Sequence, residues 1–596
     1  MKRKIIASVL TFMMVMSACP SVYAATEHYN DSSKTGDAES WQAYKDNWET
    51  LSSDYTQVSI TPGQDETELN FAWYSEKTDS EGTPVVHFGT DQEALETFEG
   101  TVGDVDTSLT GDKAYEYNHV TVTGIQPSTT YYYTVERNGE QSEVVEYTTQ
   151  SLDSVKILYV GDPQIGASVG QPQDGGELAA ESGAGNTAAL NDGFAWDRTL
   201  DAAVAENPDL SFVISAGDQV NKTGQPKEEE YAGYLSADAL KTLPVATTIG
   251  NHDSLNPDYT YHFNNPNATE YGTTEAGGDY YYSYGDGLFI VLNTNNYNVA
   301  EHKQAIEEAI AAYPDAAWRV VTIHQDIYGS GLDHSDTDGM ILRTQLTPVF
   351  DEADIDVVLQ GHDHTYSRSK LLYGDGQTHS SYEFRLNEEG TDYDWDHAYN
   401  VETDEQIPLY PEDGDEEGAA AKDAFTQDNM CYTIEDVEGN TVTDPQGILY
   451  MTANSASGSK YYELTATQQD YIAARSQNWL PSFSVITMDS DSFQIDTYQI
   501  TDDGTVEQID ETFTIEKTAG AADETATDAA AEDETSTDAA AEDETSTDAA
   551  ADETATDAAA EDETAEDAAA EDTAADETTE DAAATDAAAE STEAAE

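Results

Sequence analysis

The sequence predicts an α/β protein, with an all-β region before the α/β domain and an acidic, repetitive tail after it. Between residues 54 and 150, short alternating apolar stretches are separated by turn-rich segments, which is typical of a β-sandwich. From residue 151 to 517, apolar strand-like runs alternate with helical stretches, which indicates an α/β architecture with buried strands. Residues 518–596 contain no aromatic residue and no Leu, Ile, Val or Met, and therefore cannot build a core.

The first 53 residues are expected to direct export and then to act as a linker. Met1–Lys4 is basic, the apolar run Ile5–Ala18 is short for a membrane span, and Val22–Ala24 is a small-residue cleavage pattern. We therefore interpret residues 1–24 as a secretory signal peptide and residues 25–53 as an N-terminal linker.

A second interpretation of this segment is lipid attachment at Cys19, because Met16–Cys19 resembles the lipobox of bacterial lipoproteins. Methionine at the first lipobox position and Pro20 after the cysteine make it the weaker alternative. Removal of the signal peptide leaves Cys431 alone, so no intrachain disulfide is expected. Since no second apolar run reaches transmembrane length, the sequence predicts a secreted or cell-surface protein without a transmembrane segment.

Residues 54–150 are predicted to form a sandwich like that of a fibronectin type III domain. Ile125–Tyr131 resembles the turn and tyrosine of such a domain, in which a tyrosine hydroxyl ties down a strand corner, and Trp73 would be its core tryptophan. The strand-like stretches include Glu68–Tyr74, Pro84–Phe88 and Tyr132–Val135.

In the α/β domain, the order of apolar runs gives an expected position for each element. A polar segment at about 373–430, rich in Asp, Glu and Tyr, is most simply a surface insertion. Strands are expected at 156–160, 210–214, 245–249, 288–292, 318–323, 356–359, 448–451, 483–486 and 493–498. Helices are expected at about 192–206, 228–241, 299–313 and 340–352.

The tail repeats a unit of roughly ten residues, and we expect it to be disordered or transiently helical. A solvated spacer or solubilising tail is favoured over a specific binding segment. The whole chain has 120 acidic and 23 basic residues, a formal charge of −97. Such a field repels nucleic acid and anionic membranes, and it also repels anionic substrates unless a bound metal reverses the sign locally.

Five strands of the predicted α/β domain end in residue types that bind metals. Because sites in open α/β sheets are built beyond the carboxyl ends of strands, these ends can converge in space. A glycine before four of them permits a sharp exit from the strand. The strand-end blocks are Gly161–Gln164, Gly217–Asn221, Gly250–Asp253, His324 and Gly361–His364.

Carboxylate, imidazole and amide oxygen are ligands for metals such as zinc, manganese and iron. One carboxylate can bridge two ions about 3.5–4 Å apart, and Asp218 is the candidate bridge. Taken singly, each residue has an ordinary interpretation: Asp162 as a turn former or helix cap, His324 as a core histidine and Asn251 as a turn residue. Their occurrence in order at successive strand ends favours a metal site.

The order of these blocks resembles that of the calcineurin-like metallophosphoesterases, and the fibronectin-like region in front makes it most similar to their purple acid phosphatase branch. The resemblance covers about residues 54–517 and implies a two-layered β-sandwich flanked by helices, with a dinuclear centre of Fe, Zn or Mn. By position, it assigns Asp162 and His364 to the first metal, Asp218 to the bridge, and Asn251, His324 and His362 to the second metal.

The sequence departs from the family at two positions. Purple acid phosphatases have a tyrosine where this chain has Asn221, and other metallophosphoesterases have a histidine where it has Gln164. Gln164 or Asn221 is therefore a candidate extra ligand of the first metal, with water as the alternative. Because the iron–tyrosinate pair gives the colour of the family, we predict a colourless protein.

The resemblance also implies a mechanism, in which a metal-bound hydroxide attacks phosphorus and His252 protonates the departing alkoxide. A second interpretation of His252 is that it orients Asp162 or Asp218. His334, in a Gly/Ser/Asp loop, and Arg368 are candidate substrate contacts; a surface role for His334 and a salt bridge for Arg368 are the alternatives.

These observations predict an exported, metal-dependent phosphoesterase acting on phosphate esters, with monoesters as the first choice. A phosphodiesterase or nucleotidase of the same fold is the second hypothesis. A third hypothesis is a surface-displayed binding protein with a degenerate site, supported only by the departures at Gln164 and Asn221. Retention of the other proposed ligands argues against it.

Overall fold

The computed structural model describes residues 28–518, except residues 80–81, 112, 174–176, 182–185, 333, 336, 388–392 and 413. The predicted signal peptide, Cys19 and nearly all of the acidic tail lie outside the described residues. Among those residues, none of the helices combines the length and the apolar character needed to cross a membrane.

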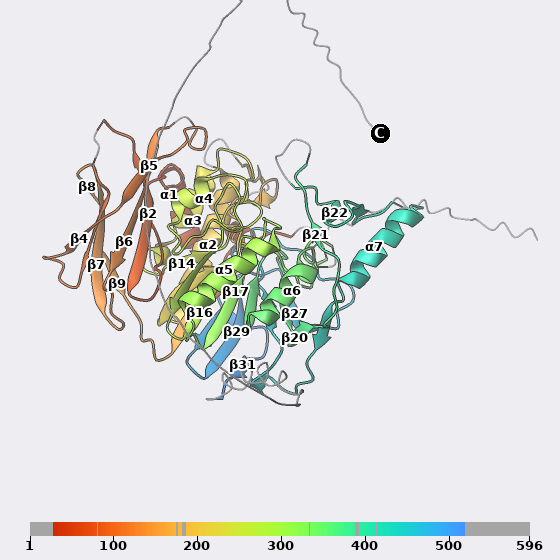
Figure 1. Ribbon diagram of the computed structural model, residues 1–596. Coiled ribbons are helices and arrows are strands. Elements are labelled where there is room, and N and C mark those ends of the chain that lie inside the picture. Colours follow the sequence, from red (N-terminus) through yellow and green to blue (C-terminus); the bar gives the residue numbers. More distant parts are fainter. Residues whose placement is uncertain are drawn as a thin grey trace, which may run out of the picture. The chain divides into compact units, whose positions relative to one another are not determined.

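The N-terminal β region consists of two antiparallel sheets that enclose one core (Figure 1). Trp73 lies in this core, and the Tyr131 hydroxyl accepts a hydrogen bond from the Gln126 amide at 2.8 Å, so the tyrosine ties down its strand corner. One sheet has the order β1 (Ser59–Pro62), β2 (Glu68–Glu76), β6 (Tyr115–Thr123) and β5 (Thr101–Asp104). The other has the order β4 (Glu96–Glu99), β3 (Val85–Gly89), β7 (Thr130–Arg137) and β8 (Glu140–Gln141), with β9 (Val145–Thr148) also paired to β7.

The α/β domain is built on two large sheets that pack face to face, which confirms the predicted two-layered sandwich. The first sheet has the order β14 (Val245–Thr247), β13 (Leu210–Ser215), β10 (Val155–Val160), β28 (Ser482–Met488), β29 (Ser492–Ile500), β31 (Phe513–Glu516) and β25 (Thr441–Thr443), with β30 (Val506–Gln508) paired to β29. The second has the order β15 (Tyr280–Tyr284), β16 (Gly287–Val291), β17 (Trp318–Thr322), β18 (Val357–Gln360), β26 (Leu449–Thr452), β19 (Tyr366–Ser369) and β27 (Ile472–Ser476).

Apolar side chains on both faces of each sheet explain why helices cover the outside. Residues such as Ile157, Phe212, Val320 and Leu359 fill the layer between the sheets. The outer face of the first sheet packs against α2 (Thr187–Glu206) and α3 (Glu228–Leu235), and that of the second packs against α5 (Val299–Ala312) and α6 (Arg343–Glu352) (Figure 1). The remaining short elements include α4 (Asp258–His262) and the 3-10 turns η1 (Ser32–Lys34) and η2 (Asp238–Lys241).

The segment predicted as a linker contains a packed helix, α1 (Ala38–Leu51). Asp37 caps it by accepting a hydrogen bond from the Ser40 amide, and Trp41 and Trp48, two turns apart, bury their side chains in the core beside α2. In the described part of residues 25–53, the predicted linker is therefore helical over Ala38–Leu51 and a connection only outside that helix and the 3-10 turn Ser32–Lys34.

The polar segment at 373–430 also has regular structure of its own. A three-stranded sheet, β21 (Tyr382–Glu383), β22 (His397–Asn400) and β23 (Gln406–Pro408), is followed by α7 (Glu416–Asp428). Its few large apolar side chains, including Phe384 and Phe425, join the core beside α6. Two further pairs complete the described strands: β20 (Leu372–Gly374) with β24 (Tyr432–Ile434), and β11 (Pro172–Gln173) with β12 (Glu177–Leu178).

Candidate metal centre

The six proposed ligands follow the carboxyl ends of parallel strands from both large sheets. β10, β13 and β14 are parallel neighbours in the first sheet, and β17 and β18 are parallel neighbours in the second. The fold therefore brings together side chains that are up to about 200 positions apart, and all six are buried. They are Asp162 after β10, Asp218 after β13, Asn251 after β14, His324 after β17, and His362 and His364 after β18.

The backbone at these strand ends is held in an uncommon conformation. Asp162, Asp218, His362 and His364 all have positive φ angles, of 46°, 47°, 69° and 47°. Non-glycine residues in this region carry a conformational cost and cluster at functional sites. Gly250 is needed for the close approach of these loops, because a Cβ at that position would collide with the Asp218 carboxylate.

One group of donor atoms surrounds the Nε2 atom of His324. It lies 3.0 Å from Asn251 Oδ1, 3.2 Å from His362 Nδ1 and 3.5 Å from Asp218 Oδ1. The other ring nitrogen of His324 donates to the Ala216 carbonyl at 2.8 Å, so in the neutral ring Nε2 carries a lone pair. Oxygen and nitrogen lone pairs thus face one another, and a cation between them would satisfy all four groups.

The ring of His362 is oriented in the same way. Its Nε2 atom donates to Asp338 Oδ2 at 3.3 Å, which leaves the Nδ1 lone pair directed at His324. Burial lowers the pKa of His362 to about 3, so the imidazole is neutral at physiological pH. A neutral imidazole whose second nitrogen donates to a carboxylate is the usual arrangement of a metal-binding histidine.

The remaining ligands form a second group around Asp162. His364 donates from Nδ1 to the Lys460 carbonyl at 2.8 Å, and its Nε2 atom lies 3.5 Å from Asp162 Oδ1. Burial holds the pKa of His364 well below its ordinary value, so this ring also offers a lone pair. Asp218 lies between the groups, because ligand atoms of Asp162, Asp218 and His324 all lie within 4.8 Å of one another.

The charges of the centre favour a cation. Burial alone would lower the pKa of His324, but the Asp218 carboxylate reverses this effect and raises it to about 9. Burial also raises the pKa of Asp162 well above its ordinary value, and the negative charge of Asp218 nearby raises it further. Protons on His324 and Asp162 would reduce the repulsion between the carboxylates, but they would leave the lone pairs of His362 and His364 unused, whereas metal ions would use them. The donor set therefore fits bound metal.

The structure distinguishes between the two candidate extra ligands. Gln164 is 2 % exposed, its backbone N–H donates to the Asp218 carbonyl at 2.8 Å, and its side-chain Oε1 atom is buried without a hydrogen-bond partner. Asn221 is partly exposed, and its backbone carbonyl accepts a hydrogen bond from His252 Nδ1. An orphaned amide oxygen beside the first group makes Gln164 the better candidate.

His252 and His334 lie at the edge of the ligand groups. The His252 amide donates to Asp218 Oδ1 at 3.0 Å, and its Nε2 atom lies 3.9 Å from Asp218 Oδ2. Its side chain is 24 % exposed, more than any of the proposed ligands. The ring of His334 lies 4.0 Å from that of His362, which places the Gly/Ser/Asp loop beside the ligands rather than on the outer surface.

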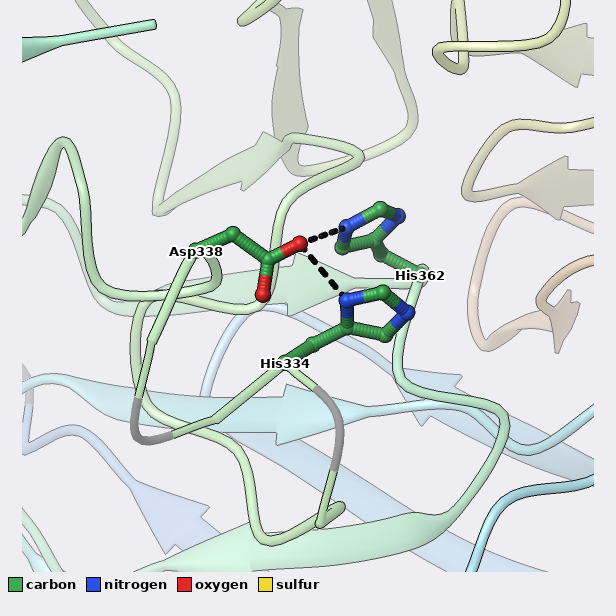
Figure 2. Close-up of side chains that lie close together, drawn as sticks. All are labelled: His334, Asp338 and His362. Atoms are coloured by element: carbon green, nitrogen blue, oxygen red, sulfur yellow. Dashed lines mark hydrogen bonds and ion pairs between the residues drawn. The ribbon is translucent and has the colours of Figure 1, made fainter. Parts of the chain in front are cut away.

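Figure 2 shows Asp338, a residue that sequence reasoning missed. A single carboxylate oxygen accepts hydrogen bonds from His334 Nδ1 at 2.6 Å and His362 Nε2 at 3.3 Å. Although burial opposes the effect, His334 and His362 hold the pKa of Asp338 well below its ordinary value. The spacing of four residues between His334 and Asp338 is the only sequence signal, and it is common in any acidic loop.

Asp363, between the two histidines of the last block, anchors the loop that carries His334. Its Oδ2 atom accepts hydrogen bonds from the Ser330 amide at 3.0 Å and the Ser335 hydroxyl at 2.8 Å. The predicted insertion also reaches the centre, because the ring of Trp395 lies 5.9 Å from that of His362.

Arg368 pairs with Asp510, which is not one of the proposed ligands. Its Nε and Nη2 atoms lie 2.7 and 3.3 Å from the two carboxylate oxygens, and its guanidinium lies over the Phe513 ring. The structure therefore supports the salt bridge over the substrate contact for this residue.

Two family models match the chain. Residues 55–149 match the purple acid phosphatase N-terminal domain, and residues 155–366 match the calcineurin-like phosphoesterases. Among solved structures, a purple acid phosphatase from yellow lupin seeds has the same fold, with a TM-score of 0.52, 14% sequence identity, and coverage of 78% of this chain and 75% of that chain.

The chain is also similar to the uncharacterized protein Rv2577 of Mycobacterium tuberculosis, with 24% identity over 337 residues, and to its counterpart MT2654 from another strain. These matches cover 52% of this chain and 60% of each relative. The chain thus contains a segment that matches the N-terminal domain of the purple acid phosphatases, followed by one that matches the calcineurin-like phosphoesterases, and its fold is that of a purple acid phosphatase-like metallophosphoesterase.

Proposed function

We propose that the protein is an exported phosphatase that hydrolyses phosphate monoesters at a dinuclear metal centre. One observation carries this proposal: each of His324, His362 and His364 donates one ring N–H to an oxygen acceptor and directs the other ring nitrogen at neighbouring ligand atoms. Three histidines oriented in this way around two carboxylates are arranged for metal ions.

The two groups of donors divide the ligands between two ions. Asp162, His364 and Gln164 would hold the first, and Asn251, His324 and His362 would hold the second, with Asp218 shared between them. Nitrogen and oxygen donors of this kind suit iron, zinc or manganese. When bound, the ions would supply Lewis acidity toward phosphoryl oxygens and an activated water nucleophile.

The residues around the ligands would position the ester and move protons. As an imidazolium, His252 is proposed to donate its Nε2 proton to the departing alkoxide, because its Nδ1–H donates to the Asn221 carbonyl and its Nε2 atom is directed toward Asp218. Its partial exposure leaves room for substrate contact. His334, held by Asp338, would stand beside the phosphoryl group on the side of His362.

Export is supported by the sequence pattern of residues 1–24. A basic start, an apolar run of signal-peptide length and a small-residue cleavage pattern favour a secreted or cell-surface phosphatase, with lipid attachment at Cys19 as the alternative form of the same proposal. Mass spectrometry of the mature N-terminus tests it, since Ala25 and acylated Cys19 are distinguishable starting residues.

Hydrolysis assays test the proposed activity. The purified chain would be stripped of metal, resupplied with zinc, manganese or iron, and given 4-nitrophenyl phosphate or the corresponding diester, bis(4-nitrophenyl) phosphate. We expect turnover to return with metal and to be faster on the monoester. Faster turnover of the diester would identify a phosphodiesterase, and the absence of turnover with every metal and ester would contradict the proposal.

A further inference from the structure

The start of helix α3 lies against the loop that carries His252. Lys227, the residue before the helix, is 1 % exposed, and its Nζ atom donates to the His252 carbonyl at 3.3 Å. The same Nζ atom lies 3.5 Å from Asp258 Oδ1, while the other oxygen of that carboxylate accepts a hydrogen bond from Gln225 Nε2 at 2.8 Å. The buried ammonium group therefore joins its counter-ion to the backbone of the proposed general acid.

Glu230, in the first turn of α3, holds the group that receives the His252 ring. It is 1 % exposed, and its Oε2 atom accepts hydrogen bonds from the backbone N–H groups of Asn221 at 3.0 Å and Lys222 at 2.8 Å. The Lys222 N–H and the Asn221 carbonyl belong to the same planar peptide group, in which they point in opposite directions. By holding the N–H, Glu230 directs the carbonyl toward His252 Nδ1.

Three hydrogen bonds thus fix the position of His252. Its amide donates to Asp218, its carbonyl accepts from Lys227, and its Nδ1–H donates to the Asn221 carbonyl. With Nδ1 occupied in this way, Nε2 is the ring nitrogen left to act on a substrate. Because two of these three bonds depend on side chains at the start of α3, this helix can determine where Nε2 points.

Stability alone does not explain the buried pair of Lys227 and Asp258. The loss of hydration offsets most of the attraction between two buried charges, so apolar side chains would stabilise the same contact about as well. An apolar side chain at position 227 could not donate to the His252 carbonyl, however. The specific contribution of the ammonium group is therefore the placement of this backbone.

We infer that Lys227 and Glu230 are positioning residues, which hold His252 where it can protonate the leaving group. This inference rests on the proposed phosphatase function, in which His252 is the general acid. Neither residue would touch the substrate; each acts through a hydrogen bond to the backbone. Such placement matters because a displacement of about 1 Å can cost about 100-fold in rate.

The step that depends on this placement is the departure of the alcohol or phenol. Water contributes its oxygen to the phosphate, and the phosphorus–oxygen bond of the ester breaks. The departing oxygen keeps the electron pair and takes the Nε2 proton of His252, which one proton of the water replaces over the cycle. Phenolate is a strong base and needs this proton, whereas 4-nitrophenolate is weakly basic and departs without it.

Steady-state kinetics on phenyl phosphate and 4-nitrophenyl phosphate, with the metal-loaded full chain, tests the inference. Lys227→Met is combined with Asp258→Asn, so that no buried charge is left unpaired. We expect this double variant and Glu230→Ala, together called the α3 variants, each to lose about tenfold or more in kcat on phenyl phosphate but less than about threefold on 4-nitrophenyl phosphate. Metal content should not change. Glu230→Gln, which keeps an acceptor oxygen, should retain most of the activity on phenyl phosphate.

Glu228→Gln is the matched control, because Glu228 lies in the same turn and is also 1 % exposed. Its carboxylate pairs with His262 at 2.8 Å and accepts a hydrogen bond from Tyr74 at 3.3 Å. A general weakening of the fold around α3 would slow both esters equally, so this variant should leave the ratio of their rates unchanged.

His252→Gln is the reference, and it should change the ratio more than either of the α3 variants. In its background, the α3 variants should change the ratio no further, because they act through the same residue. If His252→Gln changes the ratio and the folded α3 variants slow both esters equally, the inference is overturned and the proposed function stands. An unchanged ratio in His252→Gln would instead remove its role as general acid, and no turnover of either ester by the wild type would contradict the phosphatase itself.

Discussion

Each half of the candidate centre contains one histidine of the block Gly361–His364, but the two histidines donate their second ring N–H to different kinds of acceptor. In the second half, formed by Asn251, His324 and His362, the histidine of the loop donates to a carboxylate, Asp338. In the first half, formed by Asp162, Gln164 and His364, the corresponding histidine donates to a backbone carbonyl, that of Lys460.

This difference has a consequence for metal binding. A carboxylate behind a histidine makes the imidazole a stronger ligand than a neutral carbonyl does, and such partners contribute roughly 10–100-fold to affinity. The first half also has an amide oxygen in place of a histidine or tyrosine. We therefore expect the second half to hold its ion more tightly and the first half to set the choice of metal.

Asp218→Asn should have the largest effect, because it removes the proposed shared ligand from both halves. We expect kcat to fall by more than ~100-fold, beyond the range that partners of ligands account for, and metal content to fall at both positions. Activity assays and metal analysis of the purified variant measure the two effects. Loss of one ion with the other retained at full affinity would show that Asp218 does not serve both halves.

Asp338→Asn should weaken the second half alone. Replacing the carboxylate by an amide reduces the basicity of His362 and loosens His334, so we expect a loss of about 10–100-fold in activity at limiting metal. Titration of the metal-free enzyme with zinc measures the change in affinity. Asp428→Asn is the matched control, because Asp428 accepts a hydrogen bond from His379 at 2.9 Å in the insertion. Equal effects of the two variants would mean that the contribution of Asp338 is only structural.

Gln164→Ala should have a smaller effect, confined to the first half. Loss of an amide ligand is expected to lower activity by about tenfold, the low end for groups around a metal, and to shift the preference among zinc, manganese and iron. Asn221→Ala should change neither quantity. If Asn221→Ala has the larger effect, the assignment of the extra ligand is reversed.

The absorption spectrum tests the ligand set of the first half. Because Asn221 stands where coloured relatives have tyrosine, the iron-loaded wild type should lack a visible tyrosinate band, and Asn221→Tyr should gain one if the first half holds iron. A visible band in the wild type would contradict the proposed ligand set of the first half.

A buried histidine–carboxylate pair in the scaffold should show a pH effect on stability without one on metal binding. Burial lowers the pKa of His302, but Asp279, at 2.8 Å, more than compensates and raises it above its ordinary value. Its contribution to the free energy of unfolding is therefore present below about pH 6.5 and lost as pH rises through the folded-state pKa. Urea unfolding of the wild type and His302→Gln across this range should show a steeper loss of stability with rising pH in the wild type; an identical slope in both would contradict this contribution of His302.

Much of the α/β domain could be predicted because its strands are long apolar runs. The run expected at 156–160 is strand Val155–Val160, and that expected at 210–214 is Leu210–Ser215. Elements without a periodic apolar pattern were harder to predict. Helix α2 begins at Thr187 rather than near 192, because Asn186 caps the Ala189 amide in a stretch of small residues without a periodic apolar pattern.

The residues of the candidate site also fall into those that the sequence could predict and those that it could not. Residues at strand ends, such as Asp162 and His324, could be proposed from their order, because the topology of parallel strands determines where they meet. Asp338, Lys460 and Trp395 could not, because each comes from a loop or an insertion whose path depends on contacts far away in sequence. The helix in residues 25–53 was missed because its two tryptophans are spaced by two turns in an otherwise polar stretch.

Anomalous scattering from crystals of the metal-loaded protein would show directly whether Asp218 joins two ions. We expect two peaks about 3.5–4 Å apart, one bound by Asn251, His324 and His362, the other by Asp162 and His364, with Asp218 in contact with both. A single peak, or two peaks with Asp218 bound to only one of them, would overturn the dinuclear centre.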